Sequence, residues 1–464
     1  MNNTRIESDS LGEMVVPQQA LYGAQTARAI ENFPISFWPM PRRFIAALGM
    51  IKQAAAAAHH KAGRLDKPLA DAIMQACQEV IDGKHAEHFP VDVFQTGSGT
   101  SSNMNANEVI ANRAIQLLGG AVGSKSVHPN DHVNMGTSSN DVIPTAVHVS
   151  AALGIQGELI PRLNSLQKAL ARKAKQFDKV VKVARTHLQD AVPMRLGQEF
   201  SGYAEAVRQV TEMLEAGIDD LCELAIGGTA VGTGINAPEG FAAELCRQLA
   251  GKTHLPFRET SNHFAAHSLP FAAVRASGEL RAVAVALSKI ANDIRLLGSG
   301  PRCGLGELVL PATQPGSSIM PGKVNPVIPE AVIQVACQVI GCDAAIAAGA
   351  LGGVGSVLEM HVAWPMIANN LLTSITLLAN AARVFEEKCI KDLAADEKRC
   401  GELVERSLMS VTALAPKIGY DAAAALAKEA HKSNKTIREL AIEKNLLPRE
   451  ELDKLLDLRG QTGP

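Results

Sequence analysis

The feature that most constrains the fold is a set of long, alanine-rich helical stretches in the middle of the chain. Apolar residues recur with helical spacing over 144–177, 193–225 and 268–297, each about 25–35 residues long and beyond the usual globular helix. Aromatic residues are only 4% of the composition, and abundant small side chains favour closely packed helices over sheets. The pattern therefore predicts an all-α protein with an elongated central helix bundle.

The chain divides by pattern into three expected domains. Residues 1–138 indicate a mostly helical N-terminal domain, 139–394 the central long-helix bundle domain, and 395–464 a small C-terminal helical domain. A bundle of this length with mostly apolar faces would bury the excess apolar surface against other subunits. We therefore expect a homo-oligomer.

Prolines and short polar residues set the expected helix boundaries. Asp66 is the expected cap of a helix over 66–82, and Pro193 is expected to start the second long helix. Residues 92–107 are so poor in apolar side chains that we expect the next helix to begin only at about Glu108.

Composition and the N-terminal sequence indicate a cytoplasmic protein. The formal net charge of -2 argues against a nucleic-acid partner. The first ten residues are polar and have no apolar signal region, and no run of eighteen apolar residues predicts a membrane span. None of the eight cysteines forms a C-x-x-C pair, so we expect buried free thiols in a reducing compartment.

Four islands of small polar residues interrupt the helical pattern, at 92–107, 128–141, 185–190 and 316–326. Each lies at a helix end, where Ser, Thr and Asn are also the preferred caps, so any one of them alone has a purely structural reading. Together they offer hydroxyls, amides, histidines and a lysine. Because helix N-termini favour bound anions, the combination indicates a carboxylate substrate.

The last island, Gly316–Pro326, combines small residues, which leave the backbone accessible, with reactive side chains. Ser317 lies near a lysine and free amides, which makes it a candidate activated hydroxyl. Lys323 supplies a positive charge for an anion, and Asn325 supplies donors and an acceptor. The alternative is an ordinary polar connection between two helices.

The histidines have both structural and chemical readings. His187 is the one histidine of the third island, and Glu330 is a candidate to orient it and raise its basicity. His128 and His132 flank Asp131, but no further close ligand accompanies them. We therefore expect no metal site.

Taken together, these motifs resemble the signature regions of the fumarase/aspartase superfamily. The matching segments cover nearly the whole chain, and the strongest are Thr96–Thr100, His128–Asn134, Arg185–Asp190, Gly227–Gly234 and Gly316–Pro326. The resemblance implies homotetramers in which long central helices form a shared bundle and each active site takes residues from three subunits. It also implies reversible anti elimination from a succinyl-type dicarboxylate. Because that reaction has no redox step, no cofactor is expected.

The resemblance also implies a role for each matching residue. Ser317 would remove the C3 proton, and Thr186 and His187 would serve the leaving group, with His187 paired to Glu330. The substrate carboxylates would be held by Ser98, Thr100, Ser138, Ser139, Asn140, Lys323 and Asn325. A secondary anion site would consist of His128, Asn130 and Asp131.

The identity of the leaving group, water or ammonia, separates the members of the superfamily. The segments 96–100, 138–141 and 304–308 look more like class II fumarase, whereas 186–190 and 327–330 are shared or lean towards aspartase. We expect reversible hydration of fumarate to L-malate. The alternatives are ammonia elimination from L-aspartate and a non-catalytic helical scaffold.

Three segments depart from the pattern of both subfamilies. Residues 349–365 differ most, Ala184 stands where glycine is common, and Gly136-Thr137 replaces the usual Ser-Gln. They lie beside expected substrate contacts, so they bear on substrate identity more than on reaction type.

Overall fold

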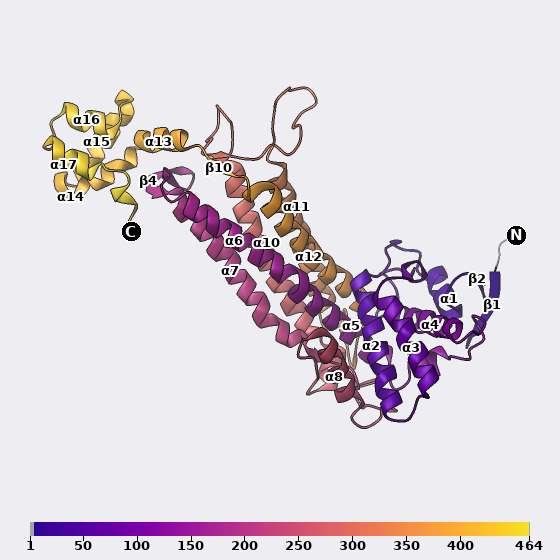
Figure 1. The fold of residues 1–464 in the computed structure, drawn as a ribbon. Helices are drawn as coiled ribbons and strands as arrows, with labels where there is room; N and C mark the ends of the chain where they lie inside the picture. Colours follow the sequence, from indigo (N-terminus) through magenta and orange to yellow (C-terminus); the bar gives the residue numbers. More distant parts are fainter. Residues whose placement is uncertain (1–3, 464) are drawn as a thin grey trace. The chain divides into compact units, whose positions relative to one another are not determined.

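The computed structural model describes residues 4–463, which form a predominantly helical fold with five short two-stranded sheets (Figure 1). The α-helices are α1 (Ala24–Asn32), α2 (Arg42–Lys61), α3 (Lys67–Ile81), α4 (Thr100–Leu117), α5 (Ser139–Gly154), α6 (Ile160–Gln176), α7 (Leu196–Leu221), α8 (Phe241–Thr253), α9 (His263–Ser268), α10 (Phe271–Leu297), α11 (Val327–Gly349), α12 (Trp364–Phe385), α13 (Glu397–Arg406), α14 (Ala415–Ile418), α15 (Tyr420–Ser433), α16 (Ile437–Glu443) and α17 (Arg449–Leu455). The strands are β1 (Thr4–Asp9), β2 (Gly12–Pro17), β3 (Val181–Thr186), β4 (Gln189–Arg195), β5 (Glu223–Leu224), β6 (Arg258–Glu259), β7 (Leu308–Val309), β8 (Ser356–Val357), β9 (Met360–His361) and β10 (Ala394–Ala395). The expected all-α class is confirmed.

Contacts between residues group the chain into two compact units. The first unit consists of Met1–Pro161, Glu212–Ala284 and Cys337–Ala379, and the second of Arg162–Thr211, Val285–Ala336 and Asn380–Pro464. The boundaries fall inside five helices, α6, α7, α10, α11 and α12, so each of these has residues in both units. The three-domain division drawn from the sequence pattern stays a prediction.

Small residues let helices approach closely in the first unit. Helices α2, α3 and α4 pack side by side (Figure 1). Gly49 lies where α2 meets α3, and a Cβ at this position would come within 3.0 Å of the Ile81 side chain. Ala54 and Ala55 on α2 are almost completely buried. The alanine-rich composition thus acts through close helix packing, as the sequence predicted.

Polar contacts between side chains fix the long helices against each other within each unit. In the first unit, Ser277 and Arg281 on α10 both donate to the Asp343 carboxylate on α11, over 2.7 and 2.5 Å. In the second unit, the Tyr203 hydroxyl on α7 donates to Asp293 on α10 over 3.0 Å. Charge-assisted hydrogen bonds of this kind set the register of one helix along the next.

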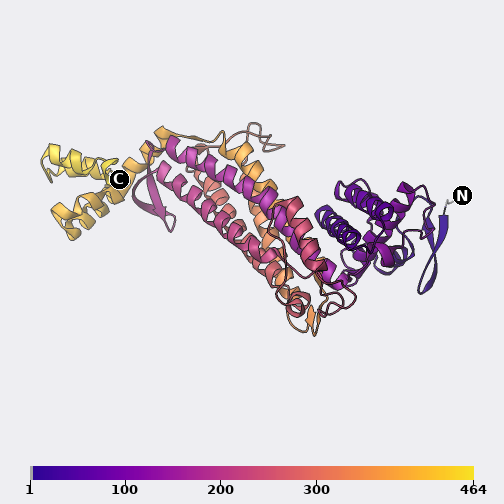
Figure 2. The ribbon, with the colours of Figure 1, turned by 60° about the horizontal axis from the view of Figure 1, so that its bottom comes forward.

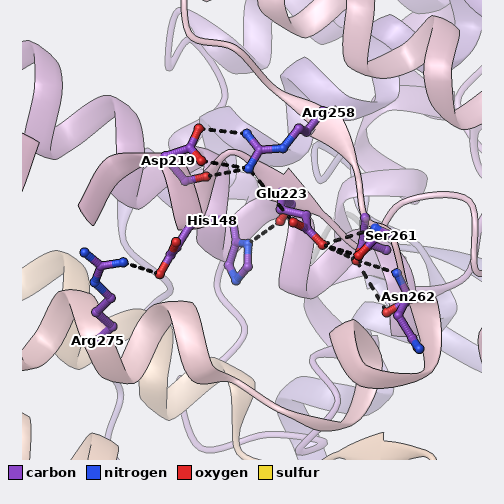
Figure 3. Close-up of polar contacts among 9 residues, drawn as sticks. His148, Asp219, Glu223, Arg258, Ser261, Asn262 and Arg275 are labelled. Atoms are coloured by element: carbon purple, nitrogen blue, oxygen red, sulfur yellow. Dashed lines mark hydrogen bonds and ion pairs between the residues drawn. The ribbon is translucent and has the colours of Figure 1, made fainter. Parts of the chain in front are cut away.

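A polar network fixes the chain just before the glycine-rich segment 227–234 (Figure 3). At the end of α7, Asp219 receives two 2.9 Å bonds from the Arg258 guanidinium. The Glu223 carboxylate accepts from the Ser261 backbone N–H over 3.1 Å, and the His148 ring bonds the Glu223 carbonyl over 2.9 Å. These contacts hold β5 parallel to β6 and so fix where the glycine-rich segment begins.

The two chain ends carry small, locally packed elements. Strands β1 and β2 form an antiparallel hairpin, drawn as indigo arrows (Figure 2). The C-terminal helices α14–α17 enclose a hydrophobic core of their own, which includes Leu414, Leu426, Leu440 and Leu452. This core lets the C-terminal segment pack as a local cluster within the second unit.

Two helix boundaries differ from those expected, and the boundary expected at Asp66 is confirmed. Helix α4 begins at Thr100, because the asparagines of the polar island are buried in the helix rather than exposed in a loop. The Asn103 amide donates to the Asn134 side chain and the Asn105 amide to the His88 carbonyl. Pro193 does not start a helix: it lies in β4, and α7 begins at Leu196. Asp66 occupies the N-cap position of α3, but its side chain makes no capping hydrogen bond.

The cysteines and one apolar helix also refine the sequence picture. All eight cysteines are free, six of them buried, whereas Cys303 and Cys337 are exposed. Among residues 4–463, α11 is long and apolar enough to cross a membrane by length and composition, with a mean hydropathy of 1.7 over a window that is 33% buried. The core helix of a soluble protein passes the same test.

Candidate active site

A chain of hydroxyl groups joins the N-termini of α4 and α5 in the first unit. The Thr100 hydroxyl lies 2.8 Å from the Ser98 hydroxyl and 2.8 Å from the Ser139 hydroxyl. Gly99, with φ 76°, is the N-cap of α4 and supplies no capping side chain. Two helix N-termini and three hydroxyls therefore meet at one place, which suits a bound carboxylate.

Helix α5 begins with a capping box that also fastens the glycine-rich segment. Ser138 is the N-cap of α5. Its hydroxyl accepts from the Asn140 N–H over 3.3 Å, and its own N–H donates to Asp141 over 2.9 Å. The other Asp141 oxygen accepts from the N–H groups of Gly227 and Thr229. The Asn140 side chain donates to the Ala230 carbonyl over 2.7 Å. Asp141 thus positions both the hydroxyl-bearing turn and the segment that faces it.

A buried lysine lies behind this turn. Lys52 on α2 is completely buried, and its ammonium donates to the Asn134 side chain over 2.6 Å. Burial lowers the pKa of Lys52 to about 7, although the nearby Asp141 carboxylate favours its charged form. Burial likewise raises the pKa of Asp141 to about 6, against the bonds from three backbone N–H groups. Burial thus opposes the charged forms of both Lys52 and Asp141, and their mutual attraction partly offsets this effect.

The three residues of the expected secondary anion site come together in one turn. The His128 ring accepts from the N–H groups of Asn130 and Asp131, over 3.3 and 3.1 Å, and so caps the short π-helical turn Pro129–Val133. Asn130 and Asp131 also line a pocket that reaches Ser138. Two of the three secondary residues, Asn130 and Asp131, and the α5 N-cap Ser138 thus border one pocket of the first unit.

His187 lies at the tip of the β3–β4 hairpin in the second unit. Thr186 pairs with Gln189, which leaves His187 and Leu188 as the two turn residues. Both have positive φ, 57° and 61°, as a type I′ turn requires. Such backbone is unfavourable for non-glycine residues and is concentrated at functional sites. Thr186 and His187 are exposed in the single chain.

The Gly316–Pro326 loop presents Ser317 as a hydrogen-bond acceptor. The Ser317 Oγ accepts from the N–H groups of Ile319 and Met320, over 3.3 and 3.0 Å. Two donors on the oxygen favour its deprotonated form. The Asn325 side chain donates to the Gly316 carbonyl over 2.6 Å, and the Gly316 N–H donates to the Lys323 carbonyl over 2.8 Å, so the loop is closed at its base.

Some expected partners are not brought together within one chain. Glu330 lies in the first turn of α11 and Lys323 is exposed in the loop before it. Within residues 4–463, the side chains of His187, Lys323 and Glu330 make no hydrogen bond or ion pair. The expected His187–Glu330 pair is therefore absent from the single described chain.

The described residues contain one group with metal-ligand spacing, and it is separate from the residues above. His85, Glu87 and His88 have ligand atoms within 4.8 Å of one another. The His85 ring nitrogen Nε2 already bonds the Glu79 carboxylate over 2.8 Å, and that of His88 lies 3.4 Å from Glu87. His128, Asp131 and His132 do not form such a group among the residues described.

The sequence interpretation did not single out Lys52 or the role of Asp141. Two signals were available: Lys52 is the one charged residue in the apolar run 44–58, and Asp141 follows Ser138 at capping-box spacing. Asn134 lay in a quoted motif, but its bond to a residue 82 positions earlier could not be read from the sequence.

Comparisons with known proteins agree with these features. Residues 12–341 match a family model described as Lyase, and residues 411–460 match one described as Fumarase C C-terminus. The chain is 54% identical to the class II fumarate hydratase of Halobacterium salinarum, over 99% of this chain and 97% of that protein. It is 49% identical to the mitochondrial fumarate hydratase of Saccharomyces cerevisiae, over 100% and 95%.

Solved structures give the same picture. A class II fumarase from Schistosoma mansoni matches with a TM-score of 0.96 and 43% identity, over 99% of each chain. A protein from Brucella melitensis described as fumarate lyase:delta crystallin, bound to cobalt, matches with a TM-score of 0.94 and 46% identity, over 99% of this chain and 100% of that one. The chain therefore belongs to the fumarase/aspartase superfamily of lyases, and within it to the class II fumarate hydratase family.

Proposed function

We propose that this protein catalyses the reversible hydration of fumarate to L-malate. The observation that carries the proposal is the match over the whole chain, at about half identity, with enzymes named fumarate hydratase. The polar geometry suits the same chemistry, because it offers hydroxyls, amides and helix N-termini for a dicarboxylate.

In this proposal the N-termini of α4 and α5 hold the substrate carboxylates. The hydroxyls of Ser98, Thr100 and Ser139 and the amide of Asn140 provide directed hydrogen bonds, while the helix ends provide positive potential. Lys323 and Asn325 complete the anion contacts from the loop. These donors matter most when proton removal converts one carboxylate into a doubly charged aci-carboxylate, because charge then develops next to them.

Ser317 removes the C3 proton of L-malate in the dehydration direction. The two loop N–H groups that bond its Oγ lower the cost of the alkoxide, and the Lys323 charge acts in the same sense. The hydroxide then leaves from the neighbouring carbon on the opposite face, with Thr186 and His187 as the groups that protonate it. Glu330 would pair with His187 and keep its ring oriented.

We propose a homotetramer in which different copies contribute to each active site. Two observations support this arrangement. The side chains of His187, Lys323 and Glu330 have no partners within the single described chain. Helix α11 exposes an apolar face that another copy would cover. Eight free cysteines without a disulfide fit the cytoplasm, where we place the enzyme.

The test is an ultraviolet assay that follows the double bond of fumarate with L-malate and L-aspartate as parallel substrates. The enzyme should form fumarate from L-malate and, in the reverse assay, consume fumarate in water. It should release no ammonia in either direction. Faster formation of fumarate from L-aspartate, with one ammonia for each fumarate, would replace hydration by ammonia elimination. No turnover of either substrate would favour a non-catalytic scaffold.

A further inference from the structure

A buried carboxylate lies beneath the hairpin that carries His187. Glu307 has no exposed surface, and its two oxygens lie 2.9 Å from the Arg185 guanidinium and 3.2 Å from the Lys182 ammonium. Lys182 also pairs with Glu199 on α7 over 2.7 Å. Two cations thus face two carboxylates, and the cluster as a whole is neutral.

A β-bulge brings both cations to the same carboxylate. Lys182 and Arg185 are three positions apart on β3, so regular alternation would direct them to opposite faces. The strand pairing shifts register between Val183 and Arg185, at Ala184. The extra residue rotates the end of the strand, so that Arg185 reaches Glu307 together with Lys182.

Glu307 itself is held rigidly by its backbone. Its N–H donates to the Leu297 carbonyl at the end of α10 over 2.9 Å, and its carbonyl accepts from the Asp396 N–H over 3.0 Å. The next residues form β7, which pairs with β10. The backbone that carries the Glu307 carboxylate is therefore held in place, whereas Thr186 and His187 lie at the exposed end of a two-stranded hairpin.

The carboxylate contacts depend on charge rather than on directed hydrogen bonds. Both Glu307 oxygens and the Arg185 Nη1 are buried without a partner at hydrogen-bond geometry, although the ion-pair distances are short. A neutral amide of the same shape would consequently lose most of the attraction. Removal of the charge also leaves two cations facing one remaining carboxylate.

We propose that Glu307 is a positioning residue: through Arg185 it fixes the turn Thr186–His187, and so sets where the leaving group receives its proton. Glu307 does not touch the substrate in this proposal, which rests on the proposed function of His187. Loss of the anchor lets the hairpin tip move, and a displacement of about 1 Å in a reacting group can cost about 100-fold in rate.

The test compares Glu307→Gln, Arg185→Gln and the double variant, each assayed as the intact assembly. Each single variant should lower kcat for L-malate by about 10–100-fold while KM changes little, because the carboxylate-binding residues are not altered. The double variant should lose no more activity than the less active single variant, since both substitutions remove the same contact. The matched control is Glu79→Gln, which breaks the ion pair with Arg113 in the first unit and should leave kcat unchanged.

Other outcomes separate this inference from the function itself. A folded Glu307→Gln protein with kcat within about twofold of wild type, or strictly multiplied losses in the double variant, would overturn the positioning role. If Glu307→Gln does not fold, Arg185→Lys is used instead, because lysine keeps the positive charge on a shorter side chain. Turnover of Arg185→Lys at the wild-type rate would also overturn the proposal. If the wild type turns over L-aspartate instead, the same variants are measured with that substrate and the inference is judged there.

Discussion

The oxygen of Ser317 is the residue-scale feature with the clearest chemical consequence. A serine hydroxyl is a weak base, and here it accepts two backbone N–H bonds from its own loop. Ser317→Ala should lower kcat for L-malate by about 10³-fold or more while the assembly stays intact. A turnover assay measures the loss in kcat, and size-exclusion chromatography with light scattering checks that the assembly is intact. Near-normal activity, or a greater loss from Ser318→Ala, would assign the base elsewhere.

Lys52 leads to a second residue-scale prediction, on how the stability of the protein depends on pH. Burial lowers the pKa of Lys52 to about 7, so above pH 7 the unfolded chain binds more protons at this residue than the folded protein. The free energy of unfolding of the wild type should therefore rise relative to Lys52→Met as pH increases from 7 towards 10, by up to about 1.4 kcal/mol for each pH unit.

Denaturant unfolding at pH 7.0 and about 9.5 measures this difference between the two proteins. Lys454→Met, which replaces an exposed lysine of α17, is the control and should leave the difference constant. A constant difference for Lys52→Met as well would mean that the ammonium is not desolvated in the folded protein.

The sequence predicted which residues belong to the candidate site better than it predicted which of them contact one another. The hydroxyl-rich segments carrying Thr100 and Ser139 were identifiable because small polar groups stand out against helical periodicity. Their 2.8 Å contact joins positions 39 residues apart and depends on how α4 and α5 pack. Lys52 illustrates the limit: its charge is visible in the sequence, but its burial against Asn134 follows only from tertiary structure.

At the scale of elements, the β3–β4 hairpin shows where periodicity was insufficient. Its two strands were read partly as a polar island and partly as the start of a helix, because Pro193 commonly begins helices. Proline is also tolerated at strand edges, and a two-stranded hairpin consists only of edges. The long helices were more predictable because their repeats are long, and the ends of α7 and α10 lie within a few residues of the expected limits. The stretch expected over 144–177 begins earlier, at Ser139, and a π-helical turn over Ile155–Leu159 divides it into α5 and α6.

The turn of this hairpin allows a prediction about strain. Leu188 has φ 61°, in the left-handed region where a β-branched side chain is least tolerated. Leu188→Val should lower the free energy of unfolding by about 1–2 kcal/mol, whereas Leu188→Gly should leave it equal or raise it. Thermal and denaturant unfolding of both variants check this. Equal effects of valine and glycine would show that the turn does not require positive φ at this position.

At the scale of the whole molecule, α11 contains a long, mostly apolar stretch that is only partly covered. Its apolar window has a mean hydropathy of 1.7 and is 33% buried, with Cys337 and Ile340 exposed on its surface. An apolar helix of this kind requires a protein core, a membrane or another subunit. The polar residues Gln334 and Gln338 on the helix and the homotetramer proposed above favour another subunit.

Gly341 offers the sharpest test of that conclusion. It lies on the exposed side of α11, and a Cβ at this position would meet nothing within 4 Å in the single chain. Gly341→Arg should therefore leave the folded chain intact but place a charge where another copy would pack. The expected result is a smaller species in light scattering, with turnover of L-malate lost because His187, Lys323 and Glu330 no longer meet partners from other copies.

The matched control is Gly401→Arg, a substitution of another exposed helical glycine, on α13, that also has no atom within 4 Å of its Cβ position. This variant should keep both the mass of the assembly and its activity, since an arginine on a solvent-facing helix is tolerated. Circular dichroism should be the same for both variants. A Gly341→Arg protein with wild-type mass would show that α11 does not form the subunit contact. Full activity in a monomer would instead place every catalytic group within one chain, and the proposed sharing of active sites would be abandoned.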